Sequence, residues 1–324
     1  MERFSSSRLV MRYLRYVHYP RAVAKLKLGA DVHHVVDHGY AHLLPHLGAG
    51  KKVVTVHDLI PMLHWKGLLG MPGSLAGRVR KPVLNQYSLS FLDGFNQVVV
   101  PSQNTAADLV THLSLNENKI KVVPAIIGEQ FGVADKAAVS DFVAEYSLET
   151  DCKWLMVTGQ DFYKNHLTSL KVLKALNKQS NFTIKMIKTG VPSEEFNQAV
   201  KKLKLEGLVR SVYLQDTRQL ALLYNFIDCL LFPSIYEGFG MPVAEALACG
   251  TPVVSSDRGS LPEVGGTLVT RLNPYDVHGL SKAVYQLISS KQARLSMRQK
   301  GPVWVAQFRP ATVAERMEKV YQNL

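Results

Sequence analysis

The sequence predicts an α/β protein with two domains, each built on a parallel sheet. Short apolar, β-branched runs alternate along the chain with helical stretches of ten or more residues, which is typical of βαβ units. The length of 324 residues is enough for two domains with large cores. A polar stretch at 134–151 separates the two halves and is the best candidate for a linker. Ligands of such folds bind beyond the carboxyl ends of the strands, so we expect the site in the cleft between the domains.

The expected elements follow this alternation in order. In the first half, apolar runs predict strands at 32–36, 52–57, 97–101 and 120–124, with helices at 40–47, 81–92 and 103–113. In the second half, the same patterns predict strands at 154–158, 183–188, 211–214, 228–232 and 252–255, with helices at 164–177, 193–203, 218–226, 242–249, 274–289 and 311–322.

The most informative motif is the run at 232–266, FPSIYEGFGMPVAEALACGTPVVSSDRGSLPEVGG. A predicted strand enters a turn formed by 238–242, and Pro242 begins a helix at a position where its missing N–H costs nothing. The free N–H groups and the helix dipole both favour negative charge, so this place suits a diphosphate. Glu245 lies one helical turn further on, where its carboxylate can accept hydrogen bonds from the vicinal hydroxyls of a ribose.

This run resembles the E-x7-E signature of the retaining glycosyltransferases of family 4, which have GT-B architecture. The whole phrase recurs, and further segments resemble the family over nearly the whole chain: VTVHDLIPM, VVVPSQNTAADLVTHL, KWLMVTGQDFYKNHLTSLKVL and LALLYNFIDCLLFPS. The alternative is an ordinary strand, turn and helix of any α/β protein. The resemblance implies two Rossmann-like domains facing a cleft, the acceptor-side domain at 1–145 and the nucleotide-sugar domain at 150–305, with a helix at 306–324 crossing back to the first.

The resemblance also implies roles for three catalytic residues. Lys164 would bind the leaving diphosphate as a flexible point charge, and Glu237 would contact the hydroxyls of the transferred sugar. His57 stands at the carboxyl end of a predicted strand and would donate to sugar or phosphate or support proton transfer, while Asp58 caps the next turn. Without the resemblance, Lys164 would be interpreted as a surface lysine at a helix start.

The other implied residues bind the donor. Backbone near Leu214 would meet the base, Glu245 would bind the ribose, and the turn would hold sugar and phosphate through backbone N–H groups. Gly159 occupies a position where many relatives carry an arginine, so one of two usual cations is absent or supplied elsewhere. The donor-binding set is Gly159, Asn165, Leu214, Gly238, Phe239, Gly240, Met241 and Glu245.

The family chemistry implied here needs no enzyme nucleophile. The diphosphate leaves as the glycosidic bond breaks, and the acceptor attacks from the same face, so stabilising the departing charge is the main task. We therefore expect a retaining, metal-independent transfer of a hexose-type sugar from a nucleotide diphosphate sugar to a glycan or lipid-linked acceptor. No separate cofactor and no metal are expected.

Two departures from the family pattern affect the first domain. Relatives open with a strand and a Gly-rich turn, whereas this chain begins in a helix and its first strand-like run is at 32–36. After Pro124, relatives often carry Asn-Gly-Val where this chain has Ala125, Ile126, Ile127 and Gly128. These departures leave open an alternative, a non-catalytic or fragmentary GT-B protein that binds nucleotide or a partner.

Histidines and cysteines raise the question of a metal. His38, His42 and His46 have an i, i+4 spacing that could chelate an ion on one helical face, but no Asp-x-Asp occurs. We favour the interpretation that these histidines form a polar helix face near the cleft and bind no metal. The three cysteines are widely spaced, which indicates buried free thiols in a reducing cytoplasm.

Charge limits the partners. The formal net charge is +12, and residues 1–81 hold 13 Lys and Arg against 4 Asp and Glu, a net of +9. A basic amphipathic helix at 3–28 could lie on an anionic membrane, although we expect Pro20 to break it and favour ordinary packing. Without a signal peptide or an apolar run of membrane-spanning length, we expect a cytoplasmic protein, with the inner membrane face as a candidate place.

Two other function classes are disfavoured. A nucleic-acid-binding protein fits the charge, but the sequence shows no aromatic–basic interleaving and no known module, so no nucleic acid is expected. A dinucleotide oxidoreductase lacks its G-x-G-x-x-G between strand and helix.

Overall fold

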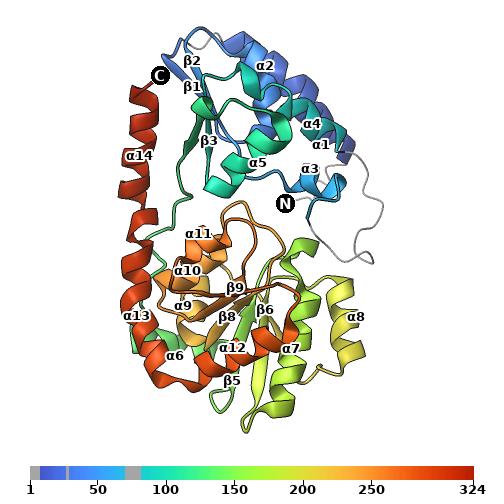
Figure 1. The fold of residues 1–324 in the computed structure, drawn as a ribbon, viewed down its shortest axis with the longest axis vertical. Helices are drawn as coiled ribbons and strands as arrows, with labels where there is room; N and C mark the ends of the chain where they lie inside the picture. Colours follow the sequence, from blue (N-terminus) through green and yellow to red (C-terminus); the bar gives the residue numbers. More distant parts are fainter. Residues whose placement is uncertain (1–7, 27–28, 70–81) are drawn as a thin grey trace. The chain divides into compact units, whose positions relative to one another are not determined.

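The structure, a computed structural model, describes residues 8–26, 29–69 and 82–324. The chain forms two compact units. Unit 1 comprises Met1–Pro124 and Glu315–Leu324, and unit 2 comprises Ala125–Ala314. Figure 1 shows both units as α/β folds, in agreement with the predicted class.

Unit 1 contains a four-stranded parallel sheet whose strands follow chain order. All four predicted strands are confirmed. Val53, Val54 and Val98 are fully buried, as expected for the β-branched interior of a parallel sheet. The strands are β1 (Val32–Val35), β2 (Lys51–Thr55), β3 (Gln97–Val100) and β4 (Ile120–Val122).

The first described segment of unit 1 is helical past the proline. It comprises α1 (Arg8–Tyr13), the π-helical turn η1 (Leu14–His18) and α2 (Tyr19–Leu26). Pro20 lies buried at the start of α2, so the prediction that it breaks the helix was wrong. In a π turn the backbone hydrogen bonds join residues five apart and not four. The hydrogen-bond pattern of the helix thus changes close to the proline, which has no N–H to donate. Residues 3–7 and 27–28 of the predicted helix lie outside the described residues.

The remaining unit 1 elements differ from the prediction mainly at 40–47. This segment is the 3-10 helix η2 (His38–His46), capped by the Asp37 side chain, which accepts a hydrogen bond from Gly39 N. The helix expected at 81–92 starts outside the described residues, and its described part is α4 and η3. The other elements are α3 (Ile60–Trp65), α4 (Val83–Leu89), η3 (Leu92–Gly94), α5 (Gln103–Leu113) and η4 (Glu117–Lys119).

Unit 2 is built on a six-stranded parallel sheet with the order β10-β9-β8-β5-β6-β7. Its first strand, β5, lies in the middle between β6 and β8, so the chain builds outward in one direction and then in the other. The five predicted strands are present, and the short edge strand β10 was missed. The strands are β5 (Lys153–Val157), β6 (Ile184–Thr189), β7 (Val209–Val212), β8 (Cys229–Phe232), β9 (Val253–Ser256) and β10 (Thr270–Leu272).

Helices cover both faces of the unit 2 sheet, and Figure 1 shows α9 and α10 on one side with α7 and α8 on the other. Each face has its own apolar core, one around Phe232 and Val243 and the other around Leu231 and Leu173. The helices are α6 (Lys136–Glu145), η5 (Phe162–Lys164), α7 (His166–Gln179), α8 (Glu194–Leu203), α9 (Thr217–Phe226), α10 (Met241–Ala248), α11 (Leu261–Gly265), α12 (Val277–Ser289), α13 (Lys291–Val305), η6 (Ala306–Phe308) and α14 (Pro310–Gln322).

The stretch expected to be a linker is instead largely helix α6, which packs against α9. Phe142 and Leu148 are buried in the unit 2 core. The two units therefore divide after Pro124, earlier than the expected boundary at residue 145. The last residues of α14 belong to unit 1, where the Tyr321 hydroxyl lies 2.7 Å from His34 Nδ1.

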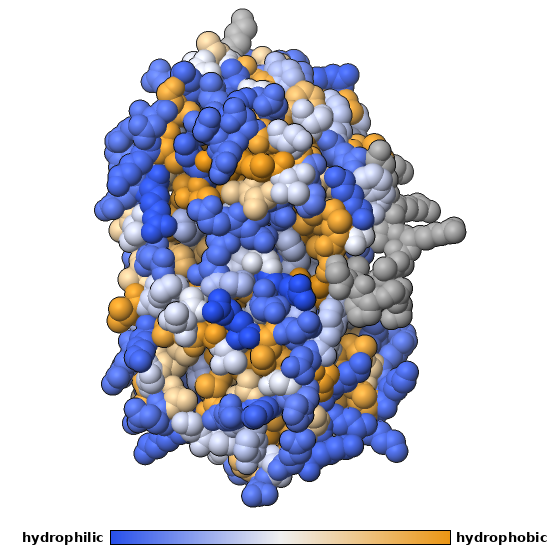
Figure 2. Space-filling model, in the orientation of Figure 1, coloured by the Kyte–Doolittle hydropathy of each residue, from blue (hydrophilic) through white to orange (hydrophobic). Residues whose placement is uncertain are grey.

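The surface is mixed. Figure 2 shows hydrophilic residues over most of the visible face, with hydrophobic residues in separate groups between them. None of the helices in the described part of the chain combines the length and the apolar composition needed to cross a bilayer.

Candidate active site

The candidate site lies in unit 2 where strand order reverses, at the carboxyl ends of β5 and β8. Such switch points leave a crevice in which ligands bind. The loop after β5 is tied to the loop after β8, because Ile235 N donates to Tyr163 O at 2.7 Å and the Ser234 hydroxyl lies 2.9 Å from the same oxygen. Residues about seventy positions apart in sequence therefore share one rigid edge.

Lys164 and Glu237 form a buried ion pair at this edge. Lys164 Nζ donates to Glu237 Oε1 at 2.7 Å, and the side chains are only 11% and 9% exposed. The Ser234 hydroxyl lies 2.6 Å from the same carboxylate oxygen. The Lys164 ammonium also lies 4.9 Å from the centre of the Phe232 ring, within cation–π range. The structure thus brings together two of the three predicted catalytic residues.

Gly159 is explained by the path of the Lys164 side chain. Gly159 has a φ of +82°, and a Cβ there would lie 2.7 Å from Lys164 Cε and 2.9 Å from Lys164 Cγ. The stem of Lys164 passes directly over this glycine. A larger residue, such as the arginine of many relatives, would therefore displace the lysine.

Asn165 fixes the lysine in place. It has a left-handed φ of 55° between η5 and α7, and its amide nitrogen donates to the carbonyls of Pro233 at 3.1 Å and Pro274 at 2.8 Å. Both amide hydrogens are used within the fold, so the side chain holds the loop, and its predicted contact with a donor stays a prediction.

The glycine-rich turn precedes α10 as predicted. Gly240 has a φ of +102°, and a Cβ there would meet Leu261 Cδ2 at 2.7 Å, so only glycine fits. In the described part of the chain, no hydrogen bond is recorded for the backbone N–H groups of Phe239, Gly240 and Met241. The Phe239 side chain is buried and packs edge-on against Phe308, 5.3 Å between ring centres. The turn thus lies at the first turn of a helix, where the helix dipole favours an anion.

Serine side chains hold the backbone around this turn through hydrogen bonds. The Ser260 hydroxyl lies 3.0 Å from Glu237 O and 2.6 Å from Phe239 O. The Ser256 hydroxyl donates to Ser234 O at 2.5 Å. These contacts fix the backbone on both sides of Glu237, and none of the three serines was among the predicted site residues.

Glu245 lies on α10, next to a tyrosine that was also missed. The Tyr224 hydroxyl, on α9, donates to Glu245 Oε2 at 3.0 Å. Burial raises the pKa of Glu245 to about 7, while the hydrogen bond from Tyr224 and the charge of Lys164 act in the opposite direction. Burial also raises the pKa of Tyr224 well above its usual value, so the hydroxyl keeps its proton as a donor. The hydrogen bond thus fixes one carboxylate oxygen of Glu245, and the predicted contact of this residue with a ribose stays a prediction.

We expect Glu245→Gln to remove a pH-dependent loss of stability. Between pH 4.5 and 7 the folded protein keeps a proton on Glu245 that the unfolded chain releases, so stability falls as the pH rises. At about 1.4 kcal/mol per pKa unit, the variant should gain about 2–3 kcal/mol over the wild type between pH 5 and pH 8. Urea unfolding at the two pH values measures this gain, and parallel pH profiles for the two proteins would contradict it.

The remaining predicted site residues belong to other elements of the two units. Leu214 follows β7 and packs against the core under α9, which leaves its backbone at the carboxyl end of the sheet. His57 belongs to unit 1, where it follows β2, and its Nε2 donates to Val36 O at 3.0 Å. Asp58 Oδ1 accepts from Ile60 N at 2.9 Å, so its predicted capping role is confirmed. Burial lowers the pKa of His38, while the charge of Asp58 raises it and that of His57 lowers it. These three residues therefore form a small polar group.

The histidine spacing considered for a metal falls on the 3-10 helix η2, whose period does not place residues four apart on one face. His42 is buried and both its ring nitrogens are engaged, with Ser88 Oγ and with Arg15 O, each at 3.0 Å. His42 could bind an ion only by giving up these bonds. In the described residues, the group with metal-ligand spacing is Glu149, Asp151 and Cys152, all distant in sequence from these histidines.

Comparison with protein families gives two matches. The family model described as glycosyl transferases group 1 matches residues 141–304, and the one described as glycosyltransferase family 4 matches residues 3–128.

Two curated relatives come from Escherichia coli. The serotype-specific mannosyltransferase WbdA is 26% identical over 250 residues, which cover 74% of this chain and 29% of WbdA. O-antigen chain mannosyltransferase B is 24% identical over 307 residues, which cover 93% of this chain and 76% of that protein. The chain thus spans less than a third of the length of WbdA.

Solved structures resemble the chain along most of its length. Anabaena HepE in complex with UDP and glucose has a TM-score of 0.78 at 15% identity, covering 96% of this chain and 83% of that one. Sucrose-phosphate synthase from Thermosynechococcus elongatus has a TM-score of 0.77 at 19% identity, covering 100% and 80%. Together with the two parallel-sheet units, these similarities confirm the predicted GT-B fold.

Proposed function

The chain belongs to the glycosyl transferases group 1 family, and from that premise we propose that it transfers a hexose from a nucleotide diphosphate sugar with retention of configuration. The observation that carries the proposal is the buried pair of Lys164 and Glu237 beside the glycine-rich turn before α10. A lone buried ion pair stabilises a fold poorly, so the presence of one at a switch point favours a function.

In the proposed reaction, each group has a separate task. The ionised Glu245 carboxylate accepts hydrogen bonds from the ribose hydroxyls, with Tyr224 holding its other oxygen. The ammonium of Lys164 and the N–H groups of Gly240 and Met241 face the diphosphate.

The bond from the anomeric carbon to the diphosphate oxygen breaks, and its electron pair stays on the phosphate. The acceptor oxygen bonds to the anomeric carbon on the same face, and its proton passes to the departing phosphate. Lys164 stabilises the charge that develops there, a contribution that is largest in the transition state. Glu237 contacts hydroxyls of the transferred sugar.

Several finer assignments are part of the proposal. The names of the E. coli relatives favour mannose as the sugar and a glycan as the acceptor. We propose that no metal is needed, because Lys164 and the helix start supply the positive charge. A cytoplasmic location at a membrane face is supported by α1 and α2, where Val10, Met11 and Leu26 are exposed beside basic residues.

The test is calorimetric titration of the protein with UDP- and GDP-sugars in the presence of EDTA. We expect binding to one nucleotide class. Tyr224→Phe should weaken it about fivefold, the value of one neutral hydrogen bond, and Glu245→Ala should weaken it more. Membrane contact would be tested separately, by co-sedimentation of the protein with anionic vesicles.

The titration also separates the alternatives. No binding to any nucleotide sugar or nucleoside diphosphate would contradict the proposal. Binding without turnover in the presence of glycan and lipid-linked acceptors would favour the non-catalytic alternative. Loss of binding in EDTA would contradict metal independence.

A further inference from the structure

Lys188 is a buried cation of unit 2 that the proposed reaction does not use. It is the last residue but one of β6, and only 1% of its surface is exposed. It is paired in register with Val157, the last residue of β5. Because side chains alternate along a strand, Lys188 lies on the same face of the sheet as Met186, which packs in the core under α7. Lys188 therefore lies beside the strand end that leads into the loop of Lys164.

The ammonium of Lys188 lacks an acidic partner. In the described part of the chain its one recorded hydrogen bond goes to the carbonyl oxygen of Thr189, at 2.6 Å, and no ion pair is recorded for it. Burial lowers the pKa of Lys188 to about 8. A buried charge without an ionic partner costs folding free energy, so its presence at the carboxyl edge of the sheet favours a function.

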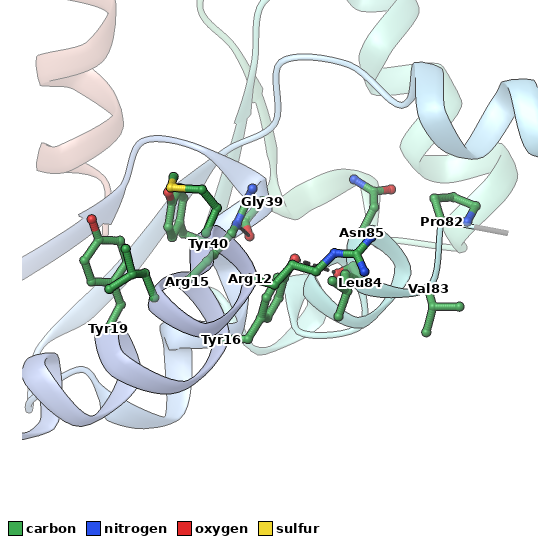
Figure 3. A pocket seen from close by; sticks show the side chains of 12 residues that line it. Arg12, Arg15, Tyr16, Tyr19, Gly39, Tyr40, Pro82, Val83, Leu84 and Asn85 are labelled. Carbon is green, nitrogen blue, oxygen red and sulfur yellow. Dashed lines mark hydrogen bonds between the residues drawn. The ribbon is translucent and has the colours of Figure 1, made fainter. Parts of the chain in front are cut away.

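Arg15 of unit 1 shows how a cation without a recorded ion pair is otherwise accommodated. It is half-buried and lines a pocket of about 590 Å³, which Figure 3 shows. Its guanidinium carbon lies 4.2 Å from the centre of the Tyr40 ring, and Nε donates to Gly39 O at 3.0 Å. An aromatic ring, a carbonyl and solvent thus stabilise that charge together. For Lys188 only the carbonyl is recorded among the described residues, so its charge needs another explanation.

A chain of hydrogen bonds joins Lys188 to the loop that carries Lys164. The hydroxyl of Thr189, the next residue along β6, lies 2.8 Å from the hydroxyl of Thr158, which follows β5. His166, the first residue of α7, donates from Nε2 to Thr158 O at 3.2 Å. Thr158 and His166 flank the loop of Lys164, so these bonds hold both of its ends.

The imidazole of His166 lies within electrostatic range of both lysines. Burial lowers the pKa of His166 to about 4, and the charges of Lys188 and Lys164 act in the same direction. The ring is therefore neutral at pH 7 and adds no charge between the two ammonium groups. Like charges in one buried region repel each other, and an anion bound by Lys164 would offset this repulsion at Lys188.

The other charged side chains around β6 are engaged elsewhere. Lys185 and Arg210 point to the opposite face of the sheet, where Lys185 pairs with a carboxylate and Arg210 donates to backbone carbonyls. On α8, the exposed Glu194 and Glu195 form hydrogen bonds with side chains of their own segment. A proton exchanged on the α7 face of this sheet near pH 8 is therefore assigned to Lys188.

From these features we infer that Lys188 is a positioning residue of the donor site. Its ammonium fixes the carbonyl of Thr189 and, through the threonine pair, the strand end before Lys164, and its charge favours the diphosphate that Lys164 binds. A bound diphosphate in turn stabilises the charged form of Lys188, so that ligand binding and protonation are linked. The inference rests on the proposed function for the identity of the ligand.

The experiment is calorimetric titration of UDP and GDP into the full chain at pH 8.5, in two buffers that differ in their enthalpy of ionisation. The difference between the buffers measures the protons taken up on binding. If the bound anion raises the pKa of Lys188 by about one unit, the uptake should be about half a proton. By the same linkage, the affinity should fall about fourfold between pH 7.5 and pH 9, because the neutral amine no longer favours the anion.

Three variants separate charge from structure. Lys188→Met keeps the length of the side chain without the charge, so it should bind about tenfold more weakly at pH 7.5 and take up no proton. Lys188→Arg keeps a charge at every pH used, so it should bind more tightly than Lys188→Met and also take up no proton. The matched control is Lys185→Met, on the same strand but on the opposite face, which should keep the affinity and the uptake of the wild type. Protons exchanged by Glu245 or by the nucleotide itself are common to all the variants and cancel in the comparison.

The possible outcomes remain distinct. If the wild type binds neither nucleotide, both the proposed function and this inference are wrong. If it binds without proton uptake, or if Lys188→Met binds as tightly as the wild type, only this inference is wrong. Weaker binding by Lys188→Met with an unchanged uptake would make Lys188 a structural residue alone. Urea unfolding establishes that each variant is folded, and the uptake by the wild type tests the inference even if Lys188→Met is not.

Discussion

Replacing Lys164 with methionine is expected to lower kcat about 10²- to 10³-fold, because the leaving diphosphate loses its main counter-charge in the transition state. Nucleoside diphosphate affinity should fall about 10- to 100-fold as a charge-assisted hydrogen bond is lost. Initial rates with a nucleotide sugar and calorimetric titration with the nucleoside diphosphate measure the two effects. The side-chain stem stays in place over Gly159, so the loop should keep its shape.

The matched control is Lys171→Met, an exposed lysine on α7 just after the site. This variant should bind and turn over like the wild type. Lys164→Met also leaves the Glu237 carboxylate buried beside Ser234 without a cation, which costs about 3–5 kcal/mol in comparable buried pairs. An unchanged kcat in a folded Lys164→Met protein would rule out the proposed role.

Glu237→Gln should have an effect of a different kind. The amide keeps the size of the side chain and the contact with Ser234 but cannot accept strong hydrogen bonds from sugar hydroxyls at both oxygens. We expect kcat to fall about 10²-fold, in the range for removal of one transition-state contact. Nucleoside diphosphate affinity should stay the same or increase, because Lys164 no longer has an internal partner that competes with the diphosphate.

The discriminating measurement is the nucleoside diphosphate affinity, which should fall in Lys164→Met and should not fall in Glu237→Gln. If Lys164→Met and Glu237→Gln weaken the binding of the nucleoside diphosphate equally, Lys164 does not bind the phosphate separately from the contact of Glu237 with the sugar. The double variant should be more stable than Lys164→Met alone, because neither charge is then left buried by itself, yet its kcat should be no higher than that of Lys164→Met. Urea unfolding of the three variants provides this comparison.

Much of the fold followed from local patterns. The four strands of unit 1 and five of the six in unit 2 were predicted from short runs with apolar and often β-branched residues, which are typical of parallel strands. The missed elements lack such a signal. Strand β10 has three residues at a sheet edge, and α13 contains Gly301 and Pro302 in a polar sequence. A Cβ at Gly301 would lie 2.2 Å from Leu247 O, so this helix is defined by close packing on α10.

The candidate site was predictable only in part. Glu237, Glu245 and the glycines of the turn stand in one long phrase that carries the resemblance, and Gly159 and Lys164 stand in another. Ser234, Ser260 and Tyr224 carry no such signal individually, because serine and tyrosine are common and their value lies in the partners they meet.

The sequence alone determined the parallel α/β class, the strand ends that carry chemistry and the family, since these depend on periodicity and on contiguous motifs. Only the tertiary structure decided which side chains meet. The Lys164–Glu237 pair, the Tyr224–Glu245 hydrogen bond and the Arg15–Tyr40 stacking join segments 73, 21 and 25 residues apart. Such pairings depend on strand order and helix packing, which are set by the burial of the whole core and not by any one stretch of chain.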